Sequence, residues 1–353
     1  MTKVVAEWTP TIDVLLPAYN EERYILRCLD SILAQDYPSE RVRVLLLDGG
    51  SSDRTVSLVR ERANTEPRVT VLTNGQRQSL GAALDAGLRQ SSAELIAKVD
   101  AHGYVEPDFL RRAVGAFRSS EAHVACVGGR FEQEGDTPFG RAVALARTSK
   151  FGIGGSVYAE TRSRRFVDSV SCGIYRRLPV LAVGGFNPHF NCGEDNELNC
   201  RLRQAGYRIL LDQTIRFHYV ARPAWRGAFR QYRNYGRAKV RILQLHPEFI
   251  RMRHLLPAGF FGALGLLGLC APFLPIARRG LVALGALYFL AATAFSLRAA
   301  RWHEFGLAVR MAAAYAALHL GYAVGSLLGV PALVAVVARR NTTSRRRQLR
   351  DTR

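Results

Sequence analysis

Apolar and polar positions alternate in a regular order over the first hundred residues. Short, continuous apolar runs predict buried strands at residues 12–17, 42–48, 69–72 and 95–100. Between them, apolar side chains recur at helical spacing and predict helices at residues 21–34, 55–63 and 80–88. This strand–helix–strand order predicts the α/β class, with a mostly parallel sheet covered by helices on both faces.

In such sheets, ligands bind beyond the carboxyl ends of the strands. Three polar residues, Asn20, Asp48 and Asp100, each follow or end a predicted strand. We therefore expect them to share one edge of the sheet.

The pattern changes after about residue 250, where Leu, Ala, Gly, Val and Phe dominate. Residues 255–277 and 281–297 are almost uncharged and close to the length that spans a bilayer, and residues 307–338 form a third apolar stretch. The alternative, buried helices of a soluble protein, is disfavoured for the first two stretches. We predict three divisions: residues 1–250 as a catalytic domain, 251–338 as a membrane region of two to four helical segments, and 339–353 as a basic cytoplasmic tail.

The topology of this membrane region stays open at the sequence level. Three full crossings from a cytoplasmic domain would export the arginine-rich tail, which the positive-inside rule places in the cytoplasm. Either the third stretch does not cross, or it turns back, or an earlier segment lies at the interface. We expect a multi-pass membrane protein whose N-terminal domain lies in the cytoplasm.

Charge narrows the classes of partner. The net charge of +20 favours nucleic acid, anionic lipid or a phosphorylated substrate. The basic tail has no interleaved aromatic residues, so nucleic acid is not expected as a partner. The six cysteines form no Cys-x-x-Cys pair, which favours a reducing compartment, and the N-terminal residues lack the apolar core of a signal peptide.

The segment Val99-Asp100-Ala101-His102 carries the first candidate chemistry. Residues two apart in an extended segment point the same way, so Asp100 and His102 could grip one divalent cation. A short Asp-x-His segment also occurs often by chance.

Two further segments close the first and second predicted strands. In Pro17-Ala18-Tyr19-Asn20-Glu21, the simplest role for Asn20 is to cap the next helix. In the segment from Asp48 to Asp53, the glycines allow a ligand to approach and the following polar residues could cap a helix. Neither G-x-G-x-x-G nor a Walker lysine is present, which disfavours dinucleotide oxidoreductases and P-loop kinases.

These three segments, taken with a fourth, resemble the family 2 glycosyltransferases of GT-A fold. The fourth comprises Val183-Gly184-Gly185-Phe186 followed by Gly193-Glu194-Asp195-Asn196-Glu197, and resembles the acceptor region of that family. The resemblance covers residues of about 10 to 245. With the apolar C-terminal part, the chain is similar to the membrane-associated branch that includes succinoglycan-type exopolysaccharide glucosyltransferases. This resemblance implies a multi-pass protein of the inner (plasma) membrane of a bacterial cell.

The resemblance implies a Rossmann-like GT-A domain and a role for each matching residue. Asp195 would be the general base, with Glu194 beside it. Asp100 and His102 would bind the metal on the donor diphosphate, and Asp48 would read the uracil. The remaining donor-site residues implied are Pro17, Ala18, Tyr19, Glu21, Gly50, Gly173 and Arg233.

Several positions depart from the family pattern or keep an alternative. An imidazole at His102 beside a carboxylate fits Mn²⁺ better than Mg²⁺, so we predict Mn²⁺ as the cofactor. His218 is either a third metal ligand or a solvent-facing strand residue. Gly173 either permits close approach of the sugar or lies in a buried strand.

The family's motif for chain extension, Gln-x-x-Arg-Trp, is not kept. Gln231 is followed by Asn234 and Tyr235 at the matching positions, which indicates transfer of a single sugar rather than processive synthesis. Nearby, Arg233 could contact a diphosphate, or it could attract anionic lipid.

The resemblance therefore predicts an inverting, non-processive transferase that uses a UDP-sugar, with UDP-glucose as the first candidate donor. The sugar would be moved to a lipid-linked or polysaccharide acceptor in surface polysaccharide synthesis. One alternative is a polyprenyl-phosphate sugar transferase, whose acceptor is the phosphate itself. A second alternative is a basic membrane-bound adaptor without catalysis.

Overall fold

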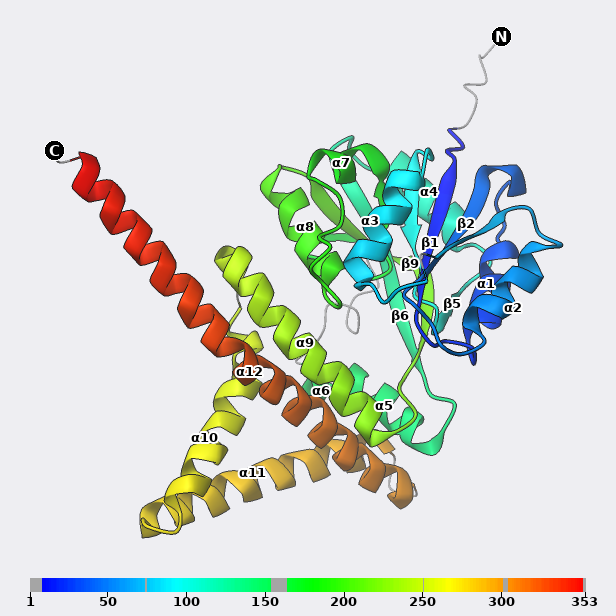
Figure 1. Cartoon of the computed structure of the whole chain (residues 1–353). Coiled ribbons are helices and arrows are strands. Elements are labelled where there is room, and N and C mark those ends of the chain that lie inside the picture. The colour runs from blue at the N-terminus through cyan, green and yellow to red at the C-terminus, as the bar shows by residue number, and fades with distance from the viewer. Residues whose placement is uncertain (1–7, 74, 154–163, 250, 301–303, 352–353) are drawn as a thin grey trace. The chain divides into compact units, whose positions relative to one another are not determined.

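The computed structural model describes residues 8–73, 75–153, 164–249, 251–300 and 304–351. The chain packs as two compact units (Figure 1). Residues 1–132 and 157–220 form the first unit, and residues 133–156 and 221–353 form the second. The boundary between the packed units therefore differs from the predicted division at residue 250. The division into a catalytic domain, a membrane region and a tail stays a prediction.

The first unit holds a sheet whose first half is parallel. Its strands are β1 (Ile12–Ala18), β2 (Val42–Asp48), β3 (Val69–Leu72) and β4 (Leu95–Lys98). They lie in the order β3-β2-β1-β4, and each neighbouring pair is parallel. All four predicted strands are confirmed, and their carboxyl ends meet at one edge as expected.

The second half of the sheet is antiparallel, which the prediction of a mostly parallel sheet did not include. The order continues from β4 through β8 (Ile174–Arg176), β6 (Val124–Glu134), β9 (Arg208–Val220) and β5 (Gly103–Val105). A short strand, β7 (Arg165–Val167), pairs with β9. These strands pair across long stretches of sequence, so local alternation of strands and helices does not reveal them.

Helices cover both faces of this sheet, as predicted (Figure 1). One face packs against α1 (Ile25–Leu33), α2 (Thr55–Ala63) and α4 (Phe109–Arg118), and the other against α3 (Leu80–Gln90), α7 (Arg177–Ala182) and α8 (Glu194–Gln204). Alternate residues of β1 serve the two faces: Val14 and Leu16 enter one core, and Leu15 the other. The sheet is therefore buried on both sides.

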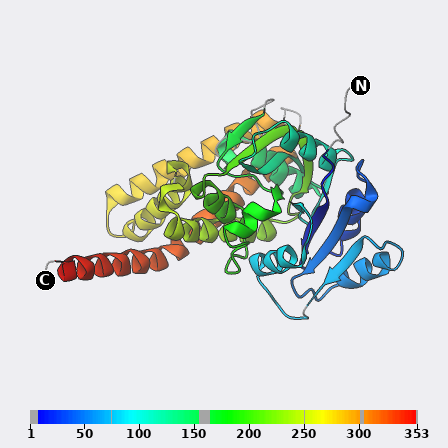
Figure 2. The ribbon, with the colours of Figure 1, turned by 90° about the horizontal axis from the view of Figure 1, so that it is seen from above.

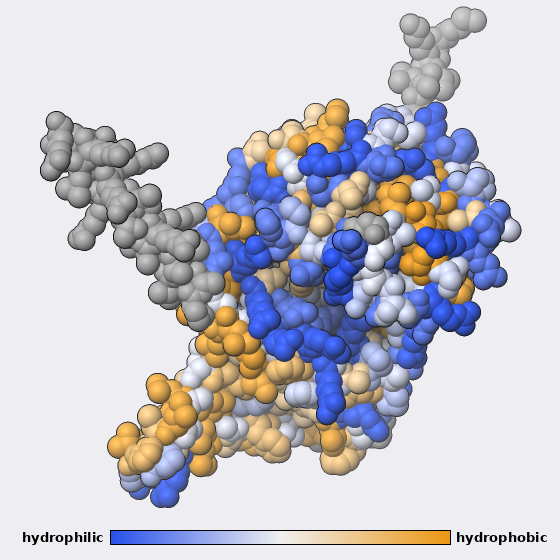
Figure 3. Space-filling model, viewed as in Figure 1, coloured by the Kyte–Doolittle hydropathy of each residue, from blue (hydrophilic) through white to orange (hydrophobic). Residues whose placement is uncertain are grey.

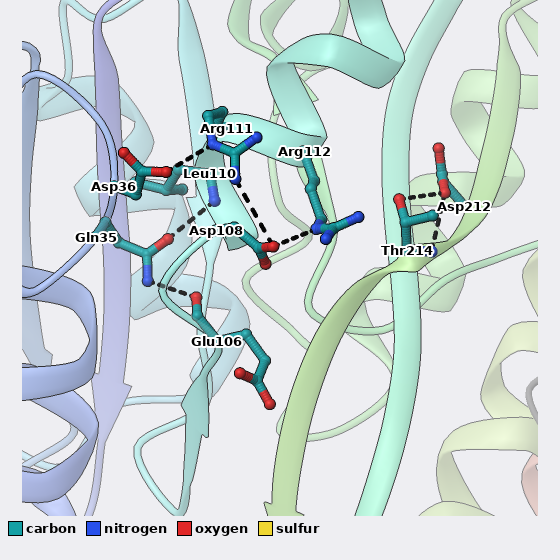
Figure 4. Close-up of polar contacts among 9 residues, drawn as sticks. All are labelled: Gln35, Asp36, Glu106, Asp108, Leu110, Arg111, Arg112, Asp212 and Thr214. Carbon is teal, nitrogen blue, oxygen red and sulfur yellow. Dashed lines mark hydrogen bonds and ion pairs between the residues drawn. The ribbon is translucent and has the colours of Figure 1, made fainter.

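Side chains fix the loop that follows β5 (Figure 4). Gln35 donates to the carbonyl oxygen of Glu106 at 2.7 Å and accepts from the backbone N–H of Leu110 at 2.9 Å. Arg112 contacts Asp108 at 2.5 Å, four residues earlier. In β9, Asp212 accepts from the hydroxyl of Thr214 at 2.7 Å. The first three bonds fix the loop between β5 and α4, and the last is a local contact within β9.

Two parallel helices form the centre of the second unit. They are α9 (Trp225–Leu245) and α12 (Phe305–Asp351), which runs on beyond the other helices of this unit (Figure 2). A Cβ atom at Gly325 would overlap the carbonyl oxygen of Arg233, and Gly321 and Gly329 also lie against α9. The two backbones can approach this closely only because these positions lack side chains.

The other helices of the second unit pack around α12. They are α5 (Pro138–Thr148), α6 (Lys150–Ile153), α10 (Leu256–Cys270) and α11 (Pro275–Ala300), with short 3₁₀ turns at Pro247–Phe249 and Met252–His254. A further 3₁₀ turn, Ser39–Arg41, belongs to the first unit. Residues 133–156 are thus inserted in the first unit by sequence but packed in the second.

Within the residues that the structure describes, two helices are long and apolar enough to cross a membrane. They are α11 and the part of α12 over Phe305–Val330. The first apolar stretch, predicted as one span over 255–277, instead breaks between α10 and α11, and α10 has only 15 residues. Apolar side chains gather on the outside of α10 and α11 (Figure 3).

Candidate active site

The segment from Asp100 to His102 forms a turn between β4 and β5, where an extended segment was expected. The strand ends at Lys98, and the N–H of Gly103 donates to the carbonyl oxygen of Asp100 at 3.1 Å. The argument that residues two apart share a direction therefore does not apply. The turn nevertheless brings both side chains to the edge of the sheet, where Asp100 remains 20 % exposed.

His102 is held by two neighbours. Its ring packs edge-on against Tyr219 of β9, with 4.6 Å between centroids. Its Nδ1 lies 3.4 Å from Oε1 of Glu21, which follows β1. A carboxylate beside Nδ1 favours the tautomer with the proton on that nitrogen, so the lone pair lies on Nε2.

The buried ammonium of Lys98 joins two parts of the site. Its Nζ lies 3.1 Å from Oδ1 of Asp100 and 2.7 Å from Oε1 of Glu194, the first residue of α8. The Lys98 side chain is only 3 % exposed. The turn after β4 and the start of α8 are therefore connected through one cation.

This arrangement sets the charges of the cluster. Burial would raise the pKa of Asp100, but Lys98 and His102 outweigh it, and the pKa lies below its usual value. For Glu194, burial raises the pKa to about 7; the neighbouring charge of Asp195 acts in the same sense and Lys98 opposes both. Burial lowers the pKa of Lys98, but Asp100 and Glu194 raise it well above the ordinary value, so the lysine is charged.

Cys172 holds the other side of Asp100. Its thiol donates to Oδ2 of Asp100 at 3.5 Å, and its backbone adopts the left-handed conformation with φ of 50°. Such a conformation is uncommon for a residue other than glycine and clusters at functional sites. Burial raises the pKa of the thiol well above its usual value, so Cys172 acts as a donor rather than as a thiolate.

The acidic pair Glu194 and Asp195 opens α8. Gly193 precedes it with φ of 75°, which favours glycine, and the helix begins at Glu194. Asp195 is buried, and its Oδ1 accepts from the N–H and the side-chain amide of Asn196 at 2.7 and 2.9 Å. The N-terminus of the helix dipole favours negative charge here.

The loops after β1 and β2 are locked together. Asn20 has φ of 54°, its Oδ1 accepts from the N–H of Ser52 at 2.8 Å, and its N–H donates to Ser51 at 3.0 Å. Asn20 is therefore a bridge between loops, and the predicted role as a helix cap is wrong, since α1 begins only at Ile25. Asp53 lies one position before Arg54, the N-cap of α2, and its Oδ1 accepts from the N–H of Thr55 at 3.0 Å.

Asp48 is buried beneath these loops. Its Oδ1 accepts from the N–H of Ser51 at 2.9 Å and its Oδ2 from the hydroxyl of Thr73 at 3.0 Å. Each carboxylate oxygen retains a second lone pair, so hydrogen bonding to a ligand stays compatible with these contacts. Gly50 has φ of 85° and lies against the backbone of Gln76. The Gln76 backbone occupies the space that a side chain at position 50 would need.

Tyr19 and Arg77 form a stacked pair at the surface. The guanidinium of Arg77 lies 3.5 Å from the centroid of the Tyr19 ring, which is 44 % exposed. Pro17 and Ala18 lie within β1, and the carbonyl oxygen of Ala18 accepts from the N–H of Gly49 at 2.8 Å. The first two sequence segments thus form one continuous surface.

The predicted third metal ligand, His218, does not join Asp100 and His102. His218 points to the opposite face of β9 from Tyr219, and its Nε2 lies 2.7 Å from Oε1 of Glu106 while its ring stacks on Tyr104 at 4.3 Å. Over the described parts of the chain, no group of three His, Cys, Asp or Glu side chains could hold a metal ion. The structure therefore does not bring His218 to Asp100 and His102, nor is it a solvent-facing residue.

Gly173 and Arg233 also have structural roles. A Cβ at Gly173 would lie 2.8 Å from Sγ of Cys126 and 2.9 Å from the Tyr175 ring, which accounts for the glycine by packing alone. Arg233 belongs to the second unit, where its backbone packs against α12. A contact of either residue with substrate stays a prediction.

The donor set fits a divalent cation of borderline character. Asp100 supplies a carboxylate and His102 an imidazole, with Glu21 behind the imidazole as in metal sites that orient their histidine. Two protein ligands leave most of the coordination sphere to a substrate, as is usual for ions that bind phosphate groups.

The sheet is parallel in one half, a carboxylate and an imidazole lie in a turn at its edge, and an acidic pair begins a helix. Together these features are typical of a glycosyltransferase of GT-A fold. The chain belongs to glycosyl transferase family 2, whose family model matches residues 13–180. The family resemblance that the sequence motifs indicated is thereby confirmed.

Relatives and a solved structure agree with this assignment. The chain is 30% identical to the succinoglycan biosynthesis protein ExoA of Rhizobium meliloti (strain 1021), over 71% of this chain and 77% of the relative. It is 26% identical to a dolichyl N-acetyl-alpha-D-glucosaminyl phosphate 3-beta-D-2,3-diacetamido-2,3-dideoxy-beta-D-glucuronosyltransferase of Methanococcus voltae, over 70% and 78%. The mannosyltransferase PcManGT of Pyrobaculum calidifontis, solved with GDP-Man and Mn²⁺, shares the fold with a TM-score of 0.61, at 21% identity over 89% of this chain and 87% of that chain.

Sequence reasoning missed Lys98, Cys172 as a partner of Asp100, and Arg77. Lys98 ends an otherwise apolar run two residues before Asp100, and a charge at the end of a buried strand is a signal that could have been used. Arg77 lies in an irregular loop, where no periodic pattern marks a residue.

Proposed function

We propose that this glycosyltransferase transfers a single sugar from a UDP-sugar, with inversion at the anomeric carbon, to a lipid-linked saccharide in the synthesis of a surface polysaccharide. One observation carries the proposal. The carboxylate of the turn after β4 and the acidic pair of α8 lie in one buried cluster joined by Lys98, with 3.1 and 2.7 Å contacts. These contacts would keep a donor side at Asp100 and an acceptor side at the start of α8 in fixed relative positions.

We assign the donor site to the surface formed by the first two loops. The exposed Tyr19 ring could stack on a base, and Asp48 could accept from a ring N–H. Pro17, Ala18, Glu21 and Gly50 shape this surface. PcManGT was solved with a GDP-sugar, so this relative does not support a uridine nucleotide. The proposed preference for a UDP-sugar therefore rests on the role of Asp48 alone.

Asp100 and His102 would hold a divalent cation on the diphosphate, and we propose Mn²⁺ as the preferred ion. The bound cation would stabilise the negative charge of the leaving nucleotide. The fold relative PcManGT was solved with Mn²⁺, which supports the choice.

On the acceptor side, Asp195 is proposed as the general base, with Glu194 beside it. The acceptor hydroxyl must lose a proton as it attacks the anomeric carbon, and a carboxylate in hydrogen-bonding reach can take it. Attack opposite the departing diphosphate inverts the anomeric configuration.

We further propose that the second unit attaches the enzyme to the inner membrane, with the catalytic unit in the cytoplasm. α11 supplies a long apolar helix with little burial, and apolar side chains face outward on α10 and α11. The name of the Methanococcus relative refers to a dolichyl-phosphate-linked sugar, which agrees with a lipid-linked acceptor.

The test is Mn²⁺-dependent release of UDP by the full chain in detergent, with and without membrane lipid extract. We expect Asp100→Ala and Asp195→Asn each to lower turnover by about 100-fold or more, the usual contribution of a general base or of one electrostatic contact. The exposed Asp30, which pairs with Arg62 on the surface, supplies the matched control Asp30→Asn.

The outcomes separate the candidate functions. Retained turnover in Asp195→Asn with loss in Asp100→Ala favours a polyprenyl-phosphate acceptor, because a phosphate oxygen needs no general base. A product of retained anomeric configuration by NMR rejects the inverting mechanism. Release in the absence of divalent cation rejects the metal site.

A further inference from the structure

Lys98 is the least expected residue of the site. Lysine is almost never fully buried unless it is paired, yet the side chain of Lys98 is 3 % exposed. It ends β4, and its N–H donates to the carbonyl oxygen of Gly173 at 3.0 Å. Its backbone is therefore fixed by the sheet, and its ammonium has a defined position.

The ammonium bridges two carboxylates from distant parts of the chain. Nζ contacts Oδ1 of Asp100 at 3.1 Å and Oε1 of Glu194 at 2.7 Å. Because Cys172 donates to Oδ2 of Asp100, both oxygens of that carboxylate have a partner. Rotation of the carboxylate about its Cβ–Cγ bond would break both contacts, so its orientation is fixed.

The Lys98 ammonium also keeps the acidic residues around it from competing with one another. Asp100, Glu194 and Asp195 lie near one ammonium, and all three act electrostatically on Lys98. Without a cation between them, like charges would compete for a proton or for a metal ion. With Lys98 in place, Glu194 is bound to the lysine and is not a competing ligand for a metal at Asp100.

We propose that Lys98 is a positioning residue, which orients the Asp100 carboxylate toward the donor's metal ion and keeps Glu194 on the acceptor side. The proposal rests on the proposed function, in which Asp100 binds that ion. The competing explanation is purely structural: Lys98 would only neutralise the buried charge of Glu194.

The paired variant Lys98→Met/Glu194→Gln distinguishes the two. It removes one positive and one negative charge, so the net charge of the site is unchanged, and it leaves no buried charge of the ion pair behind. The control is Glu194→Gln alone, which keeps the contact between Lys98 and Asp100.

The primary measurement is the affinity of the full chain for Mn²⁺ in the presence of UDP, from the EPR signal of unbound Mn²⁺. We expect the paired variant to bind Mn²⁺ about tenfold or more weakly than Glu194→Gln, as when a partner that orients a metal ligand is removed. In the same comparison kcat should fall, while thermal unfolding should be similar. Lys98→Arg, which keeps the cation, should recover most of the Mn²⁺ affinity.

If the paired variant does not fold, Lys98→Gln takes its place. Removing a positive charge beside a cation site would by Coulomb's law tighten Mn²⁺ binding, so weaker binding reports lost orientation. Mn²⁺ affinity and kcat equal to those of Glu194→Gln in the paired variant, or tighter Mn²⁺ binding in Lys98→Gln, would overturn the proposal. A wild-type chain without Mn²⁺-dependent sugar transfer would instead reject the proposed function.

Discussion

Individual residues of the site were predictable where a strand ends in a polar segment. Asp48, Asp100 and Asn20 do share the carboxyl edge of the parallel strands, because sheet topology decides that edge. Contacts between distant segments were not predictable: the bridge from Lys98 to Glu194 spans 96 residues of sequence. The orientation of His218 also depends on the pairing of β5 with β9, which no local pattern reveals.

Glu194 gives the site a pH dependence of definite sign. Burial raises the pKa of this carboxyl to about 7, so Glu194 takes up a proton as the pH falls below that value and its ion pair with Lys98 is lost. We expect turnover to decline on the acid side with a midpoint near pH 7. The measurement is the pH profile of kcat from pH 5.5 to 8.5.

The same profile in Glu194→Gln is the comparison. Because glutamine does not titrate, this variant should lose the acid limb near pH 7. An unchanged midpoint in the variant would assign the titration to another group.

At the scale of elements, local patterns identified strands and helices but not their partners. Every strand of the parallel half was predicted within a few residues, because a buried strand reads as a continuous apolar run. The alanine-rich α5 was not predicted. Its apolar face packs in the second unit, against residues of α9, α11 and α12 that are distant in sequence.

The contact between α9 and α12 depends on glycine. Replacing Gly325 by leucine would force its side chain into the Arg233 carbonyl group, and overpacking of this kind costs about 1–3 kcal/mol. We expect a clear drop in the midpoint of thermal unfolding in detergent.

Gly265 on α10 supplies the matched control. No atom lies within 4 Å of a Cβ built there, so Gly265→Leu should leave the midpoint unchanged or raise it slightly through better helix propensity. Equal losses for the two variants would contradict close packing between α9 and α12.

At the scale of the whole molecule, the sequence predicted a catalytic part followed by a membrane part, and the packing is less simple. The basic helix α9 lies N-terminal to residue 250, yet it packs with the apolar α12. The alternation of strands and helices ends well before α9, so the pattern alone gave no reason to group it with the C-terminal helices.

A chain shortened after residue 250 tests this organisation. It would keep α5 and α9 but lose α12, which covers Tyr232 and the alanines of α5 in one apolar cluster. We therefore expect the shortened chain to aggregate without detergent, measured by size-exclusion chromatography. A monodisperse, detergent-free product would contradict the expected dependence on α12.

The insertion of residues 133–156 has a consequence for recombination between relatives. The chain passes between the two units three times, after residues 132, 156 and 220. A hybrid made by joining the N-terminal part of one relative to the C-terminal part of another would therefore combine α5 and α6 of the first parent with α12 of the second. Functional hybrids should need both inserted helices from the parent that supplies the C-terminal helices.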